Sequence, residues 1–118
     1  MSMESDLTAL LKTLCVRTFP DFAPINTVRP YITYQQIGGR DLRWMDKAAA
    51  DKQHSLVQVN VWADTRASAN ILARQIEAAL VASTAFSAVP DGALQGDADP
   101  DFGRYGTRQD FNIIALRA

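Results

Sequence analysis

The chain has 118 residues, 47% of them hydrophobic, which is the size and composition of one globular domain spanning 1–118 that needs no metal or disulfide to hold its core. Twelve basic and thirteen acidic residues leave a net charge of -1, which argues against a dedicated duplex-DNA binder, because such proteins carry a basic excess. The single cysteine excludes an intrachain disulfide. With no basic leader and no apolar run of about 18 residues, we expect a reduced, cytoplasmic protein that does not enter a membrane.

Residues 5–18 are predicted to form the first helix. Leucines recur at three- and four-residue spacing along this segment, which is typical of a helix with one buried face. Cys15 extends the apolar stripe. Its apolar neighbours and the absence of a nearby histidine favour a small buried side chain over a reactive thiol.

Residues 19–30 are predicted to be a connector, because their prolines disfavour helical geometry. The apolar side chains of Phe19, Phe22 and Ile25 are expected to fold back onto the core. A strand is predicted over residues 31–37, which are rich in Ile, Thr and Tyr.

Residues 40–53, the excursion segment, mix basic and acidic side chains. We predict a long excursion between two antiparallel strands, 31–37 and 56–62. Its tip is expected to be mobile, and a helical turn in its alanine run is the alternative.

The central unit of the chain joins a strand to a helix. Val57, Val59 and Val61 alternate with mixed residues, which predicts a strand with one aliphatic face. The apolar spacing then changes to three and four residues, which predicts an amphipathic helix of about 15 residues. Asp64 or Thr65 is the expected N-cap, because either side chain can accept from the first free N–H groups.

The last third of the chain is predicted to add strands. Residues 86–94 form a weak strand, 96–106 a polar loop, and 109–116 a final strand. Ile114 and Leu116 lie on the second face of that strand and suggest that part of this face is also covered. The fold class is therefore α+β: a mostly antiparallel sheet of about four strands with two main helices packed on one face.

Two polar features of the sequence partly resemble catalytic or metal-binding sites. His54 is the only histidine, so it cannot build a zinc site with other histidines or cysteines, and a Ser–His–Asp arrangement with Ser55 has no supporting motif. Asp97, Asp99 and Asp101 alternate as at the start of an EF-hand loop. The turn glycine and the bidentate glutamate of that loop are missing, so a solvated acidic loop is preferred.

A pair of glycines and the two tryptophans also suggest structural or interface roles. Gly38 and Gly39 are too few to cradle a phosphate, and they are predicted to end a strand or to allow a bulge. Trp44 lies within the charged excursion segment, where it is interpreted either as an interface contact or as a side chain folded onto its own sheet. Trp62 ends a strand, and packing in the core is predicted for it.

Four stretches in order carry a resemblance: the LTALLKTL helix, the PYITYQQIGG strand, the VQVNVWADTRASANILARQIEAAL unit and the closing RYGTRQDFNIIAL strand. Together they resemble the small phage and prophage tail-completion proteins, a family that includes tail-terminator and head–tail joining proteins. The similarity covers most of the chain, but residues 40–53 and 84–106 match no pattern of the family.

The resemblance implies a structural role without catalysis. Family members assemble as rings, commonly six-fold, that stop the growth of the tail tube and offer a surface for head attachment. It implies no catalytic, cofactor-binding or metal-binding residues and no specific binding to nucleic acid or membrane. The implied partners are further copies of the chain, the tail-tube protein and a head-completion or connector protein, in the virion tail and, during assembly, in the host cytoplasm.

A ring closed by head-to-tail contacts needs two different patches on each subunit. The excursion segment is the candidate for one of them, with Trp44 as the central contact and Arg40 and Arg43 as polar contacts. Two other classes of function remain open: a small cytoplasmic enzyme or ligand-binding domain with a pocket between sheet and helices, and a regulatory or toxin–antitoxin dimer.

Overall fold

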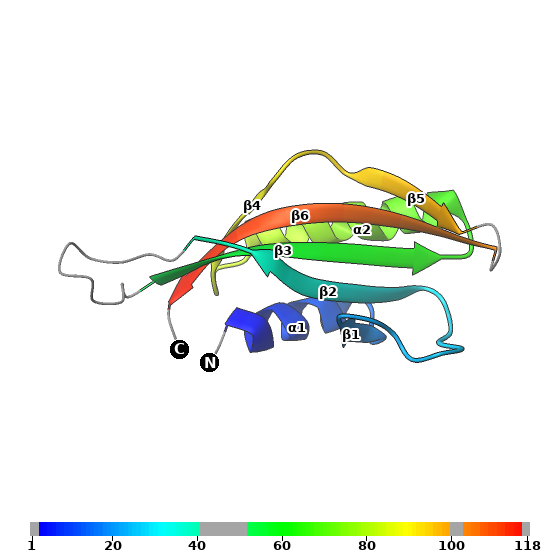
Figure 1. Ribbon diagram of the computed structural model, residues 1–118, viewed down its shortest axis with the longest axis horizontal. Coiled ribbons are helices and arrows are strands. Elements are labelled where there is room, and N and C mark those ends of the chain that lie inside the picture. The colour runs from blue at the N-terminus through cyan, green and yellow to red at the C-terminus, as the bar shows by residue number, and fades with distance from the viewer. Residues whose placement is uncertain (1–2, 41–51, 100–102, 117–118) are drawn as a thin grey trace.

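The structure is a computed structural model that describes residues 3–40, 52–99 and 103–116. These residues form two helices and a six-stranded sheet, mostly antiparallel, which confirms the predicted α+β class with more strands than the expected four (Figure 1). The helices are α1 (Met3–Leu14) and α2 (Arg66–Ala82). The strands are β1 (Thr18–Pro20), β2 (Tyr31–Gly38), β3 (Lys52–Ala63), β4 (Ser87–Pro90), β5 (Gln95–Asp99) and β6 (Arg104–Leu116).

Two long strands form the centre of the sheet. β3 and β6 pair in antiparallel fashion from Lys52 opposite Leu116 to Ala63 opposite Tyr105. β2 pairs with the other edge of β3, and the short β1 pairs in parallel with β2. β4 and β5 both pair with the far edge of β6, one after the other along its length.

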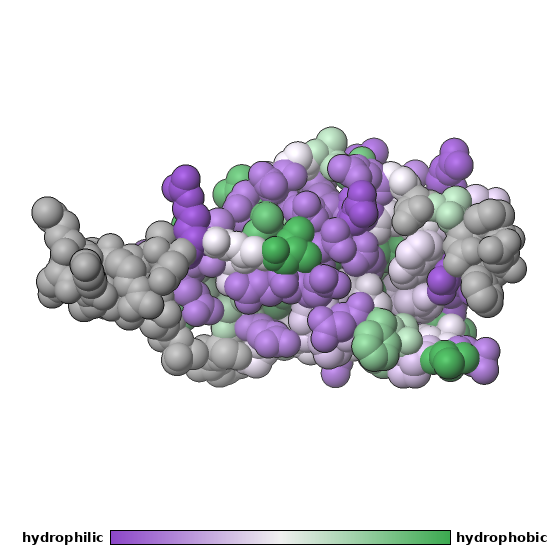
Figure 2. Space-filling model, in the orientation of Figure 1, coloured by the Kyte–Doolittle hydropathy of each residue, from purple (hydrophilic) through white to green (hydrophobic). Residues whose placement is uncertain are grey.

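The two faces of the sheet differ in what covers them. Burial alternates along β3, and Val57, Val59 and Val61 are buried together with the apolar stripes of α1 and α2. Both helices therefore cover one face. The opposite face, called the open face below, is turned toward the viewer in Figure 1, and Figure 2 shows that most of its side chains are polar.

The N-terminal half departs from the sequence predictions at one point. The first helix ends at Leu14 rather than at residue 18, and Thr18 begins a strand that the sequence did not predict. The Thr18 hydroxyl donates to the Cys15 carbonyl at 2.7 Å, so a tight turn ends the helix and feeds the chain into β1. Cys15 itself is buried, as predicted, and its Sγ lies 3.4 Å from the Pro30 carbonyl.

The connector does not fold back as expected. Phe22 is 80% and Ile25 is 92% exposed, so the prediction that they join the core is wrong. The reason is the presence of β1, which already occupies the position beside β2 and leaves the loop to pass outside the sheet. Phe19, within β1, is half-buried.

The second helix follows the prediction closely. It has 17 residues, and Thr65 is the N-cap, because its side chain accepts from the Ser68 N–H at 3.1 Å. Within the described ranges, no helix has both the length and the apolar character that crossing a membrane requires.

The predicted polar loop over residues 96–106 is wrong. It contains β5 and the first residues of β6, which pair from Gln95 opposite Arg108 to Asp99 opposite Arg104. The strand signal was hidden because this pairing depends on backbone hydrogen bonds to a long neighbour and not on an apolar face. The strand predicted over residues 86–94 is shorter than expected, because only Ser87–Pro90, which is β4, forms a strand there.

Candidate assembly surfaces

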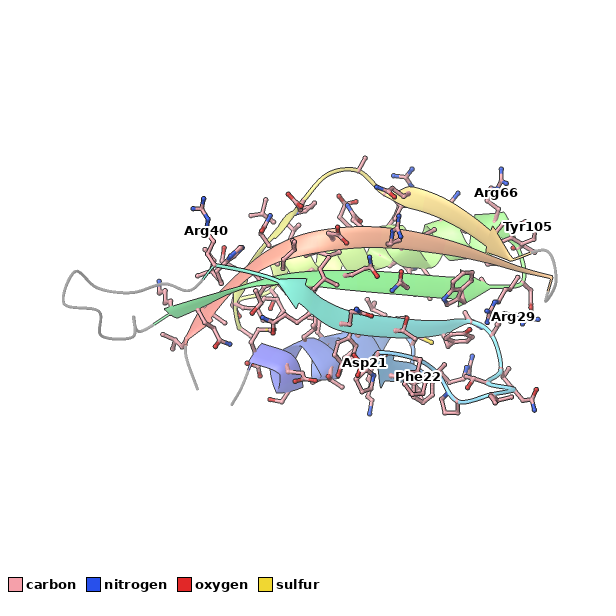
Figure 3. All side chains as sticks on the ribbon, viewed as in Figure 1. Asp21, Phe22, Arg29, Arg40, Arg66 and Tyr105 are labelled. Carbon is pink, nitrogen blue, oxygen red and sulfur yellow. The ribbon has the colours of Figure 1, made fainter. Side chains whose placement is uncertain are left out.

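Arg40 lies two residues after the end of β2 and is the first residue of the excursion segment (Figure 3). Its backbone N–H donates to Nδ1 of His54 at 2.8 Å, and its side chain is exposed. The other two predicted interface residues, Arg43 and Trp44, lie outside the described residues, as does most of the excursion segment. The interface built on these three residues therefore stays a prediction.

His54, on β3, links β6 to the segment that follows β2. Because Nδ1 accepts from Arg40, the ring proton is placed on Nε2, which lies 2.8 Å from Oδ1 of Asn112 on β6. Successive side chains of a strand point to opposite faces, and Ser55 is buried on the helix side. Both ring nitrogens of His54 are thus engaged, and its neighbour Ser55 points away from it.

Gly38 and Gly39 let the backbone at the end of β2 pass close to the backbone of His54. β2 ends at Gly38, and the register shifts between Gln36 and Gly38, so both predicted roles, strand end and bulge, are confirmed. Gly39 has φ +143°, and a Cβ there would lie 2.4 Å from the His54 carbonyl oxygen. Only glycine fits at this position. A shallow cavity of about 550 Å³ lies at this corner, lined by Gln36, Gly38, Gly39, Arg40 and His54.

Trp62 lies on the open face and not in the core, so its predicted position is wrong. The alternation along β3 places it opposite the buried Val61 and Ala63, where it is only half-buried. The guanidinium of Arg104 lies 4.7 Å from the ring centroid of Trp62, and Nη1 of Arg104 donates to the Tyr31 hydroxyl at 2.9 Å. This cation–π contact holds the side chain flat on the sheet.

The loop between β1 and β2 carries an exposed apolar patch that the sequence did not predict. Phe22, Ile25 and Val28, called the loop patch below, are exposed by 67% or more. Several large exposed apolar side chains on one loop are a candidate protein interface. The sequence signal was present, since the apolar residues alternate with prolines that keep the segment from joining a helix or strand.

A second apolar patch lies on the open face. Leu56, Val89, Ile114 and Leu116, called the sheet patch, come from β3, β4 and β6. Ile114 is 40% and Leu116 is 69% exposed, so within one chain the expectation that this face is partly covered is wrong. Figure 2 shows an apolar island on this face surrounded by polar side chains.

The space between α2 and the sheet is small. The cavity between α2 and the sheet measures about 10 Å³, which is no larger than one water molecule needs. A second cavity of about 230 Å³ lies between the start of α1 and β2 and is lined in part by Glu4 and Asp21. Among the described residues, no three His, Cys, Asp or Glu side chains cluster as metal ligands do.

Comparison with known protein families shows which family the chain belongs to. The family model described as tail completion protein gp17 matches residues 2–113, and no curated protein matches the chain. The matched region includes both helices and nearly all of the sheet, up to Ile113 in β6. The chain therefore belongs to the tail completion protein gp17 family, a family of phage tail components.

Proposed function

We propose that the protein caps the phage tail tube as a ring of identical subunits and provides the surface to which the head is joined. Family membership supports tail completion, and one structural observation supports the ring. The chain exposes two apolar patches made of different residues on different elements, the loop patch and the sheet patch. A head-to-tail contact that closes into a ring needs two unlike patches of this kind.

The role is structural and involves no catalysis. The only histidine bridges the backbone of Arg40 and the side chain of Asn112, which is a cross-link between strands. The partners are further copies of the chain, the tail-tube protein and a head-completion or connector protein. A net charge of -1 suits a ring through which DNA passes without being held. Assembly takes place in the host cytoplasm, and the product is part of the virion tail.

The excursion segment forms part of one ring contact. Its first residue, Arg40, is bonded through its backbone N–H to His54. His54 pairs with Ile114, so this bond lies beside the sheet patch. Trp44 supplies the central contact of this segment, with Arg40 and Arg43 as polar contacts. Truncation of such a tryptophan typically costs about 2 kcal/mol or more at an interface.

Assembly tests the proposal directly. Light scattering of the parent protein should show monomers at low concentration and closed rings at high concentration or with purified tail tubes. Trp44→Ala should abolish rings, whereas Trp44→Phe, which keeps an aromatic side chain, should retain part of the association. Circular dichroism checks that each variant is folded. If the parent forms no ring even with tail tubes, the ring function is wrong; if Trp44→Ala assembles normally, the contact lies elsewhere.

A further inference from the structure

We propose that ring neighbours meet with the loop patch of one copy seated on the sheet patch of the next. This inference rests on the proposed ring and names the contact that closes it. The two patches face each other across the subunit boundary, so each copy uses its loop patch once and its sheet patch once. The occupant of the open face is therefore a second copy of this chain.

The loop patch is presented in a fixed conformation. Phe22, Ile25 and Val28 are 80%, 92% and 67% exposed. Between them, the Thr27 N–H donates to the Pro24 carbonyl at 3.2 Å, and Asn26 has φ +67°. A turn held by hydrogen bonds and prolines loses little conformational freedom when it binds, which favours its use as the inserting side of a contact.

The sheet patch spans three strands, with Asn112 between Leu56 and Val89. Leu56 pairs with Asn112, while Val89 pairs with that same Asn112 from the other side. Ile114 and Leu116 follow Asn112 on the same face, since alternate residues of a strand share a face. Diagonal neighbours in a sheet lie about 7–8 Å apart, within reach of large side chains, so the four side chains can form one apolar surface.

The two patches lie at different ends of the long strands. The loop leads into Tyr31, which pairs with Trp62, whereas Leu56 lies six residues earlier on β3, about 20 Å away at the rise of an extended strand. A two-fold axis that passed through either patch would pair that patch with its own copy. A contact between unlike patches uses both surfaces and leaves neither exposed inside the ring.

The charges around the patches favour the contact between unlike patches. Asp21 adjoins the loop patch and lines a cavity together with Glu4. Arg40 and Lys52 lie at the Leu116 end of the sheet patch, since Lys52 pairs with Leu116. No ion pair joins any of these four side chains to another described residue. Loop against sheet brings opposite charges together, whereas loop against loop would bring carboxylates together.

Two other charged groups are arranged so that they do not oppose this contact. Arg29, at the far end of the loop, is already paired with Asp64 at 2.6 Å. Asp110 lies on the open face two residues before Asn112, at the end of the sheet patch away from Lys52. The acidic side of the loop therefore has one favoured orientation, toward Arg40 and Lys52.

Mixed cross-linking of single-cysteine variants tests the contact. In a Cys15→Ala background, Ile25→Cys reports on the loop patch and Ile114→Cys on the sheet patch. We expect a short bis-maleimide to link the two variants when they are mixed under ring-forming conditions, and to link neither variant to itself. Val81→Cys is the matched control, because Val81 is 55% exposed on α2 and belongs to neither patch.

Association measurements provide the second readout. Ile25→Ser and Ile114→Ser should each raise the concentration needed for ring formation about tenfold or more, whereas Val81→Ser should leave it unchanged. Circular dichroism confirms that the variants are folded. Cross-linking of Ile25→Cys to itself would show that loop patch meets loop patch and would overturn the proposal.

The outcomes separate this contact from the ring function. If the parent protein forms rings and both serine variants form them at the same concentration, the proposed contact is wrong and the ring function stands. A parent protein that stays monomeric with tail tubes would overturn both.

Discussion

Gly106 lies directly beneath the indole ring of Trp62. A Cβ built on Gly106 would be 2.7 Å from Cε3 of that ring and 2.9 Å from the Val61 carbonyl oxygen, closer than real Cβ contacts. The missing side chain lets the ring lie flat across the strand pair, with the Arg104 guanidinium stacked on it. One residue without a side chain thus makes room for the largest side chain of the open face.

Gly106→Ala should destabilise the protein. The added methyl group must displace both a ring and a backbone carbonyl, and such overpacking typically costs about 1–3 kcal/mol. Chemical denaturation measures the free energy of unfolding. Gly96→Ala is the matched control, since no atom lies within 4 Å of the Cβ it would add, and its effect should stay within about 1 kcal/mol.

A double-mutant cycle identifies the source of that cost. In a Trp62→Ala background, Gly106→Ala should cost less than in the parent, because the ring that it displaces is gone. An equal cost in both backgrounds would mean that the strain comes from the backbone contact with Val61 and not from Trp62.

The elements with strong apolar periodicity were predictable from the sequence. β3 and α2 were found because Val57 to Val61 and Leu72 to Ile76 show the period of the element directly. β1 and β5 were missed because each is short and lies at an edge of the sheet. Their residues have no apolar alternation, and backbone pairing with a neighbouring strand decides their conformation.

The candidate surfaces were less predictable than the fold. Sequence reasoning placed Phe22 and Ile25 in the core because apolar side chains usually find cover within their own chain. Whether that cover exists depends on the path of β1, which a local pattern cannot show. Trp62 was misplaced for a different reason: its alternation with Val61 already indicated the other face of the sheet, and the predicted core position rested on its residue type alone.

The two faces of β6 should respond differently to truncation. Phe111 is 1% exposed and packs on the helix side, so Phe111→Ala should cost about 3–5 kcal/mol. Leu116 is on the open face, and Leu116→Ala should change the stability of the monomer by no more than about 0.5 kcal/mol. Denaturation at low protein concentration keeps association out of the measurement. Similar costs for both variants would contradict the register of β6.

The N-cap of α2 should contribute measurably to stability. The Thr65 hydroxyl accepts from the Ser68 N–H, so Thr65→Ala leaves a first-turn donor without its partner and should cost about 1 kcal/mol. Thr65→Ser keeps the hydroxyl and is the control, with an expected change of a few tenths of a kcal/mol at most. Thermal unfolding of the three proteins compares them. Equal loss in both variants would point to the methyl group of Thr65 and not to its cap.

Hydrogen exchange at one amide tests how the excursion segment is held at its base. The Arg40 N–H donates to the imidazole of His54, so His54→Ala removes its acceptor. A hydrogen bond contributes about 1 kcal/mol, and exchange of the Arg40 amide should therefore accelerate roughly fivefold. Asn112→Ala is the control, because it breaks only the Nε2 contact of His54 and should change that amide less. The Val59 amide, in the middle of β3, reports global unfolding in every variant. An Arg40 amide that exchanges at the same rate in His54→Ala and in the parent would show that His54 does not hold the base of the segment.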